Sequence, residues 1–122
     1  MRQSNLVCES FVAGADLSAL QFTCVKMTGV NTVVSAAAAT APILGVLQNN
    51  PESGQTATVA YGGIVKVLAG GAITQNDKVT ATTGGAVIAT TTDTNYILGV
   101  ALDTAASGDY ARVMITHGMV AG

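Results

Sequence analysis

The residue types that most often carry enzyme chemistry are sparse in this 122-residue chain. His117 is the single histidine, so a Ser-His-Asp or Cys-His arrangement would have to be built around it. It lies one residue beyond a predicted strand, where an exposed strand-end histidine is the simpler interpretation. We therefore expect no catalytic role for it.

Two carboxylates, Asp103 and Asp109, flank an Ala-Ser-Gly turn and could form an acid and base pair. Metal binding would need more oxygen ligands than this loop offers, and solvated turn caps are the favoured interpretation. An open alternative is a β-clip-type enzyme or ligand-binding domain, with several of Asp77, Asp103, Asp109 and His117 converging in a pocket between subunits. We expect no enzyme activity, cofactor or metal.

Cysteines and glycines also favour a structural interpretation. Cys8 and Cys24 are the only cysteines, too few for the disulfide framework of a small secreted protein, so free thiols in a reducing compartment are expected. The sequence leaves open whether the two bond to each other. Glycine pairs recur, but no Gly-Lys-Ser/Thr follows them and no GxGxxG occurs, so they are predicted to be turn residues.

The composition excludes several classes of protein. The chain is 49% hydrophobic, 10% charged and 4% aromatic, with a net charge of −2, which excludes disorder and argues against nucleic acid and anionic membranes as partners. No apolar run reaches the ~18 residues of a spanning helix, and Glu9 cuts the N-terminal apolar run too short for an export signal. We expect synthesis in a cytoplasm and a surface partly covered by a partner or by further copies.

The chain contains an internal repeat. Shifted by 54 residues, Cys24–Gly62 overlies Lys78–Thr116 with twelve identities in 39 positions, where chance predicts roughly three or four. Ile-Leu-Gly-Val recurs intact, and Ser-Gly follows its glycine at the same distance in both copies. The matched residues fall at the strand and turn positions of a strand–turn–strand unit, which predicts a duplicated β unit.

Local signals within each unit are those of strands, because Val, Ile and Thr suit a pleated surface. The predicted strands are Phe22–Thr28, Asn31–Ser35, Ile43–Leu47, Thr56–Tyr61, Ile64–Leu68, Lys78–Thr82, Ala86–Thr90, Tyr96–Leu102 and Tyr110–Thr116. Gly- or Asn-marked turns separate them, including Gly62-Gly63, and residues 36–41 and 90–95 are predicted to be loops. We expect an all-β fold, a small barrel or sandwich, with an extended N-terminal arm at 1–11 and a single β domain at 12–122, its repeats spanning 12–66 and 67–118.

Several motifs, in order and spacing, resemble the capsid cement, or decoration, proteins of tailed bacteriophages. The resemblance covers roughly residues 12–116 and is carried by Ala13–Ala19 leading into Phe22–Lys26, Pro42–Val46, Gly62–Val67, Ala69–Ile73 before Asp77–Val79, Ile97–Leu102, Ala105–Asp109 and Ala111–Ile115. Each motif alone is only a turn and a strand. Their combined order is what makes the resemblance specific.

This resemblance implies a small all-β virion protein that binds the outside of the expanded icosahedral head and reinforces it against DNA pressure. It implies the major capsid protein as partner and a homo-oligomer, a trimer being favoured, made in the bacterial host cytoplasm. The family brings no catalytic residues, and its turn glycines correspond to Gly45, Gly54, Gly99 and Gly108, which are expected to be structural. Other virion roles, a head-fibre base or a tail component, stay open.

The N-terminal segment is the predicted contact with the capsid. We expect the arm to lie on the shell and to add a strand to a capsid sheet edge, through Arg2, Gln3, Ser4, Asn5, Leu6 and Val7. Deleting residues 2–7 is then expected to abolish capsid binding and leave the body folded.

Overall fold

A computed structural model describes residues 3–38, 42–90 and 96–119. Its elements are β1 (Ser4–Ala13), β2 (Cys24–Gly29), β3 (Thr32–Ser35), β4 (Gly45–Leu47), β5 (Thr56–Leu68), β6 (Lys78–Ala81), a 3-10 turn (Thr83–Gly85), β7 (Val87–Ala89), β8 (Tyr96–Ala101) and β9 (Tyr110–Met119). The predicted all-β fold class is confirmed.

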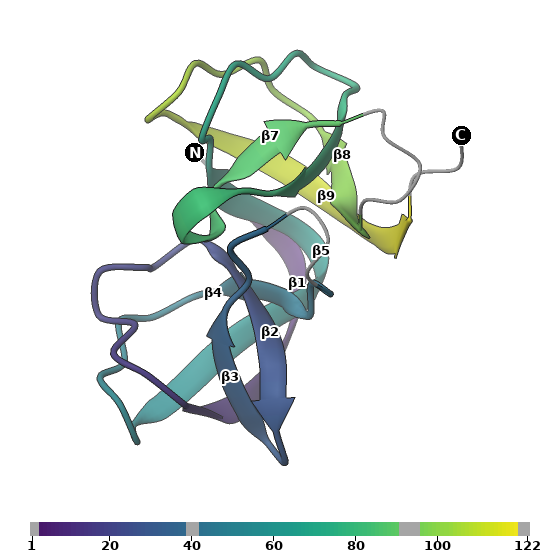
Figure 1. Ribbon diagram of the computed structural model, residues 1–122. Helices are drawn as coiled ribbons and strands as arrows, with labels where there is room; N and C mark the ends of the chain where they lie inside the picture. Colours follow the sequence, from purple (N-terminus) through teal and green to yellow (C-terminus); the bar gives the residue numbers. More distant parts are fainter. Residues whose placement is uncertain (1–2, 39–41, 91–95, 120–122) are drawn as a thin grey trace.

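The first five strands close into a barrel, which forms the lower half of Figure 1. Around it the order is β1, β3, β2, β4 and β5, and β1 pairs with β5 to complete the circuit. β1 runs parallel to β3 and antiparallel to β5. Closure removes the free strand edges that an open five-stranded sheet would expose.

The second half uses the other end of β5. Beyond its pairing with β4, this 13-residue strand pairs with β9, and the order continues through β8 and β6 to β7. Just after β5, Ala69 forms a parallel bridge with Val87 of β7, and the Gly70 N–H donates to the Val87 carbonyl at 2.8 Å. The second half therefore closes in the same way as the first, and one strand serves both barrels.

Backbone contacts repeat with the 54-residue spacing of the sequence. The Phe22 N–H donates to the Leu47 carbonyl, and the Asn76 N–H donates to the Ala101 carbonyl. Both Phe22 (φ 65°) and Asn76 (φ 78°) lie in the left-handed region. The predicted boundary between the repeats, after residue 66, falls inside the shared strand β5.

Two clusters of buried side chains form the interior. The smaller fills the first barrel: Ala13, Leu17, Val25, Val33, Leu47, Ala57 and Val59. The larger fills the second barrel and also includes residues from the first half: Cys24, Ala36, Ile43, Val46 and Ala60. Because the 3-10 turn also packs on the Cys24 backbone, where a Cβ on Gly85 would meet the Cys24 carbonyl at 2.7 Å, the barrels share an apolar junction.

The N-terminal segment is a strand and not the predicted extended arm. Ser4–Phe11 lies within β1 and pairs with β5 from Ser4 opposite Ile64 to Val12 opposite Thr56. The physical reason is closure, since without β1 this edge of β5 and the end of β3 would lack a partner. The alignment at 54 residues missed β1, because its counterpart is β5 itself at a spacing of 56, as Ala13 and Ala69 show.

The predicted turn at Gly62-Gly63 is also wrong, because both glycines lie inside β5. Register shifts between β1 and β5 occur here, and a Cβ on Gly62 would lie 3.3 Å from the Val7 side chain. Gly63 has φ 92°, so the pair lets a continuous strand bend from one barrel into the other. The predicted loops at 36–41 and 90–95 fall mostly outside the described residues.

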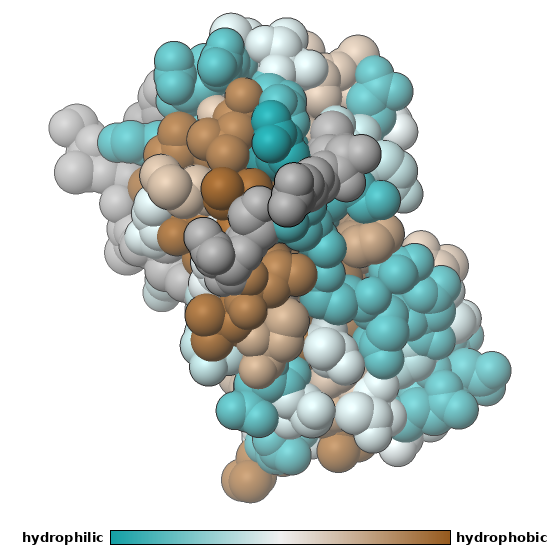
Figure 2. All heavy atoms as spheres, turned by 180° about the vertical axis from the view of Figure 1, so that it is seen from behind, coloured by the Kyte–Doolittle hydropathy of each residue, from teal (hydrophilic) through white to brown (hydrophobic). Residues whose placement is uncertain are grey.

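Hydrophobic atoms also reach the surface. From behind, they gather over the middle of the molecule and beside hydrophilic atoms on the second barrel (Figure 2). The large exposed hydrophobic side chains are Val7, Val12, Met27, Val30, Tyr61, Tyr110 and Met114. Among the described residues, none belongs to a helix with the length and apolar character needed to cross a membrane.

Candidate functional site

Two of the three carboxylates considered for catalysis, Asp77 and Asp103, form hydrogen bonds with nearby residues. Asp77 Oδ2 accepts a hydrogen bond from the Thr74 N–H at 2.9 Å, and Asp103 pairs with Arg112. His117 lies in β9. Within residues 3–38, 42–90 and 96–119, no group of three or more His, Cys, Asp or Glu residues is arranged to hold a metal ion.

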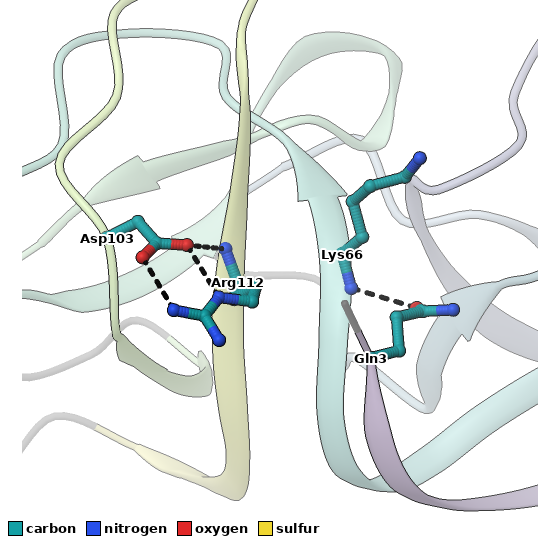
Figure 3. A network of polar contacts seen from close by, with 4 residues as sticks. All are labelled: Gln3, Lys66, Asp103 and Arg112. Carbon is teal, nitrogen blue, oxygen red and sulfur yellow. Dashed lines mark hydrogen bonds and ion pairs between the residues drawn. The ribbon is translucent and has the colours of Figure 1, made fainter. Parts of the chain in front are cut away.

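Asp103 ties the loop after β8 to strand β9 (Figure 3). Its Oδ2 accepts hydrogen bonds from the Arg112 backbone N–H and Nε, each at 3.0 Å, and its Oδ1 accepts one from Nη2 at 3.0 Å. These contacts, led by the side-chain hydrogen bonds from Arg112, lower the pKa of Asp103. In the first repeat, Asn49 takes the place of Asp103: the Thr58 N–H of β5 donates a hydrogen bond to Asn49 Oδ1 at 3.1 Å.

The pair makes stability depend on pH. Because the folded-state pKa of Asp103 lies below its unfolded value, its contribution is complete above about pH 4 and is lost as the pH falls through the folded-state pKa. Asp103→Asn keeps an acceptor for the Arg112 N–H, as Asn49 does for Thr58, and loses the ion pair. We expect a slightly lower melting temperature at pH 7, and a difference from wild type that shrinks below about pH 4. A difference that stays constant to pH 2 in thermal melts would contradict this role.

Both cysteines are free thiols, as predicted. Cys8 is exposed on β1, whereas Cys24 is buried at the junction, where burial raises the pKa of its thiol to about 12. Cys24 therefore behaves as a small apolar core residue and not as a nucleophile.

The four glycines assigned to turns form two matched pairs. Gly54 (φ 85°) and Gly108 (φ 89°) lie in equivalent turns, and a Cβ there would meet nothing within 4 Å. The turn assignment is wrong for Gly45 and Gly99, which lie in β4 and β8. There, a Cβ would come within 2.2 Å of the Ala60 carbonyl oxygen and 1.9 Å of the Met114 carbonyl oxygen, respectively, so the neighbouring strand leaves room only for hydrogen.

Of the predicted capsid-contact residues, Gln3 and Leu6 engage the protein itself. Gln3 Oε1 accepts a hydrogen bond from the Lys66 N–H at 2.9 Å (Figure 3). Gln3 Nε2 donates a hydrogen bond to Gln48 Oε1 at 3.0 Å. Leu6 packs on the larger core, while Val7 is 47% exposed. Ser4 and Asn5 lie in β1, and Arg2 lies outside the described residues. Capsid contact by these six residues stays a prediction.

A cluster that the sequence interpretation missed lies at the junction. The Lys66 ammonium group lies 4.2 Å from the Phe22 ring centroid and 5.0 Å from that of Tyr110, and the two rings meet edge to face at 5.9 Å. Phe22 has a left-handed backbone conformation, which costs a non-glycine residue about 1–3 kcal/mol. The equivalent residue of the second repeat, Asn76, has the same conformation. These contacts join the end of the loop before β2 to β5 and β9.

Comparison with known proteins agrees with this architecture. The family described as phage cement protein matches residues 13–116. Among solved structures, the N base of the head fibre gp8.5 of bacteriophage phi29 superposes with a TM-score of 0.70 at 18% identity, covering 96% of this chain and 99% of that one. At this identity the similarity is one of fold. A search of curated proteins found no match.

Proposed function

Because the chain belongs to the phage cement protein family, we propose that it binds the outer surface of the expanded phage head and reinforces the shell against the pressure of packaged DNA. The observation that carries this proposal is the family match over residues 13–116, which extends across both barrels. A role in the virion also agrees with the fold shared with a phage head-fibre base.

The physical basis is linkage between binding and shell stability. A protein that binds the expanded shell more tightly than other states stabilises that shell by mass action. Many copies across the seams between subunits add contacts that must break before the shell opens. Two barrels joined by one strand offer a rigid body for such contacts, because little conformational freedom is left to lose on binding.

The partners and the assembly belong to the same proposal. We expect the major capsid protein to be the binding partner and the protein to act as a homo-oligomer, a trimer by family resemblance, after synthesis in the host cytoplasm. The composition supports self-association or partner binding, since only 10% of residues are charged and Tyr110 and Met114 are more than two-fifths exposed.

The test is co-sedimentation of the purified protein with expanded, DNA-filled heads of the parent phage prepared without it. We expect saturation at a simple ratio to the shell subunits, and coated heads that release DNA at a higher temperature than bare heads. Saturation at only a few copies per particle would instead favour the second candidate, a head-fibre base, which the shared fold supports. No binding would overturn both.

A further inference from the structure

The repeat allows each position of one barrel to be compared with its counterpart in the other. Strands β5 and β9 of the second barrel pair Ile64 with Met114, Lys66 with Arg112 and Leu68 with Tyr110. Residues directly opposite each other on antiparallel strands share one face of the sheet. The intervening residues Val65, Val67, Ala111 and Val113 are fully buried, so these six side chains form the outer face of the second barrel.

The equivalent face of the first barrel has a different chemistry. There, β1 and β5 pair Cys8 with Ala60, Ser10 with Thr58 and Val12 with Thr56. The backbone pairing is the same in both barrels, so the fold is satisfied by small and hydroxyl-bearing side chains at these positions. The large apolar, aromatic and cationic side chains of the second barrel therefore exceed what the fold requires.

Contacts within the protein account for only part of this difference. Lys66 and Tyr110 meet Phe22 across the junction, and Arg112 meets Asp103. Even so, Tyr110 is 42% and Met114 44% exposed. The counterpart of Met114, Ala60, is fully buried in the junction core. The second half of the protein thus covers Ala60 of the first barrel, whereas the equivalent residue of the second barrel, Met114, is exposed.

Charge indicates what would cover this face. Two cations, Lys66 and Arg112, stand side by side on a chain whose net charge is −2. Arg112 is neutralised by Asp103, whereas Lys66 rests on aromatic rings and, among the residues that the structure describes, no carboxylate pairs with it. Aromatic, methionine and arginine side chains are enriched in protein interfaces, and an unneutralised lysine beside them favours a partner that carries carboxylates.

We propose that this outer face of β5 and β9 is the surface that docks on the phage shell, against a patch of the shell protein that carries carboxylates among apolar side chains. The inference rests on the proposed cement function and assigns it to one face of one barrel. Apolar contact by Ile64, Met114 and Tyr110 supplies most of the affinity, and Lys66 selects the acidic partner.

The chain supplies its own substitutions for the test. Lys66→Ser, Arg112→Thr and Met114→Ala, combined, place on the second barrel the residues that the first barrel carries at the equivalent positions, with Asp103→Asn added to match Asn49. The control is Ser10→Ala with Thr58→Ala on the first barrel. Binding to heads is measured by co-sedimentation, folding by thermal melting and oligomeric state by light scattering. Met114→Ala, Lys66→Ser and Lys66→Glu are also measured singly, so the test stands if the combined variant does not fold.

We expect the combined variant to bind heads at least about tenfold more weakly than wild type with its oligomeric state unchanged, and the control variant to bind normally. Lys66→Glu should weaken binding further than Lys66→Ser, and salt should weaken the wild type but hardly affect Lys66→Ser. If wild type binds and the face variants bind equally well, the inference is wrong. Loss of binding together with loss of oligomerisation would assign the face to self-association and overturn the inference. If wild type itself does not bind, it is the proposed function that fails.

Discussion

Gly99→Ala is expected to lower the free energy of unfolding by about 3 kcal/mol or more, because the added methyl group can be accommodated only if the backbone of the neighbouring strand moves. A Cβ at this position would lie 1.9 Å from the Met114 carbonyl oxygen and 2.8 Å from its carbonyl carbon. These are backbone atoms of the paired strand β9, so no rotamer change can make room. Separating β8 from β9 would break the ladder that closes the second barrel. Urea denaturation measures the loss.

Gly108→Ala is the matched control for this substitution. Gly108 has φ 89° and open space around it, so alanine there meets only the left-handed backbone penalty of roughly 1–2 kcal/mol. The predicted order of stability is therefore wild type, then Gly108→Ala, then Gly99→Ala. Equal losses for the two variants would show that β8 and β9 can separate at little cost, contrary to the close approach described above.

Deletion of residues 2–7 is expected to destabilise the folded protein by about 2–4 kcal/mol, through the loss of a packed leucine and a hydrogen-bond acceptor. The deletion removes Leu6 from the larger core and the Gln3 side chain from the Lys66 N–H. It also removes the part of β1 that covers Gly62 and pairs with Ile64. Thermal melting and denaturant titration of the shortened chain check this result.

Gln3→Ala separates the two contributions of that segment. It leaves β1 intact and removes the acceptor of one backbone N–H, so we expect a loss of about 1 kcal/mol. A shortened chain as stable as the full chain would restore the interpretation of residues 1–11 as a free arm. If the shortened chain is less stable, its weaker binding to heads could come from the damaged fold as well as from a lost contact. Capsid contact by Val7 is therefore tested with substitutions that leave β1 intact.

Several parts of the fold could be predicted from the sequence because they depend on local chemistry. Strands rich in Val and Thr, such as Lys78–Ala81, and the turns at Gly54 and Gly108 follow from side-chain stiffness and positive φ. The order of the barrel strands could not be predicted in this way. The pairing of β1 with β5, which closes the first barrel, depends on contacts between residues more than 40 positions apart.

Gly45 and Gly99 show a second limit. A glycine beside a run of β-branched residues reads as a turn, whereas here it marks the place where another strand's carbonyl passes. The outer face of β5 and β9 shows a third. Identical residues reveal the duplication in the sequence. Positions where the two copies differ, such as Thr58 and Arg112, indicate a functional difference only once the structure shows that both residues occupy equivalent places in the two barrels.

The shared strand β5 also determines how the molecule carries a mechanical load. A force that pulls the barrels apart acts along a continuous covalent backbone, and not only across a packed surface. The ladders of β1 and β9 on β5 are then loaded in shear, so that several hydrogen bonds must fail together. The shortest pairings lie elsewhere, at two-residue pairings such as that of β4 with β5 and at the single bridge between Ala69 and Val87. Under tension, each barrel would open at such a seam before the joint between the two barrels gave way.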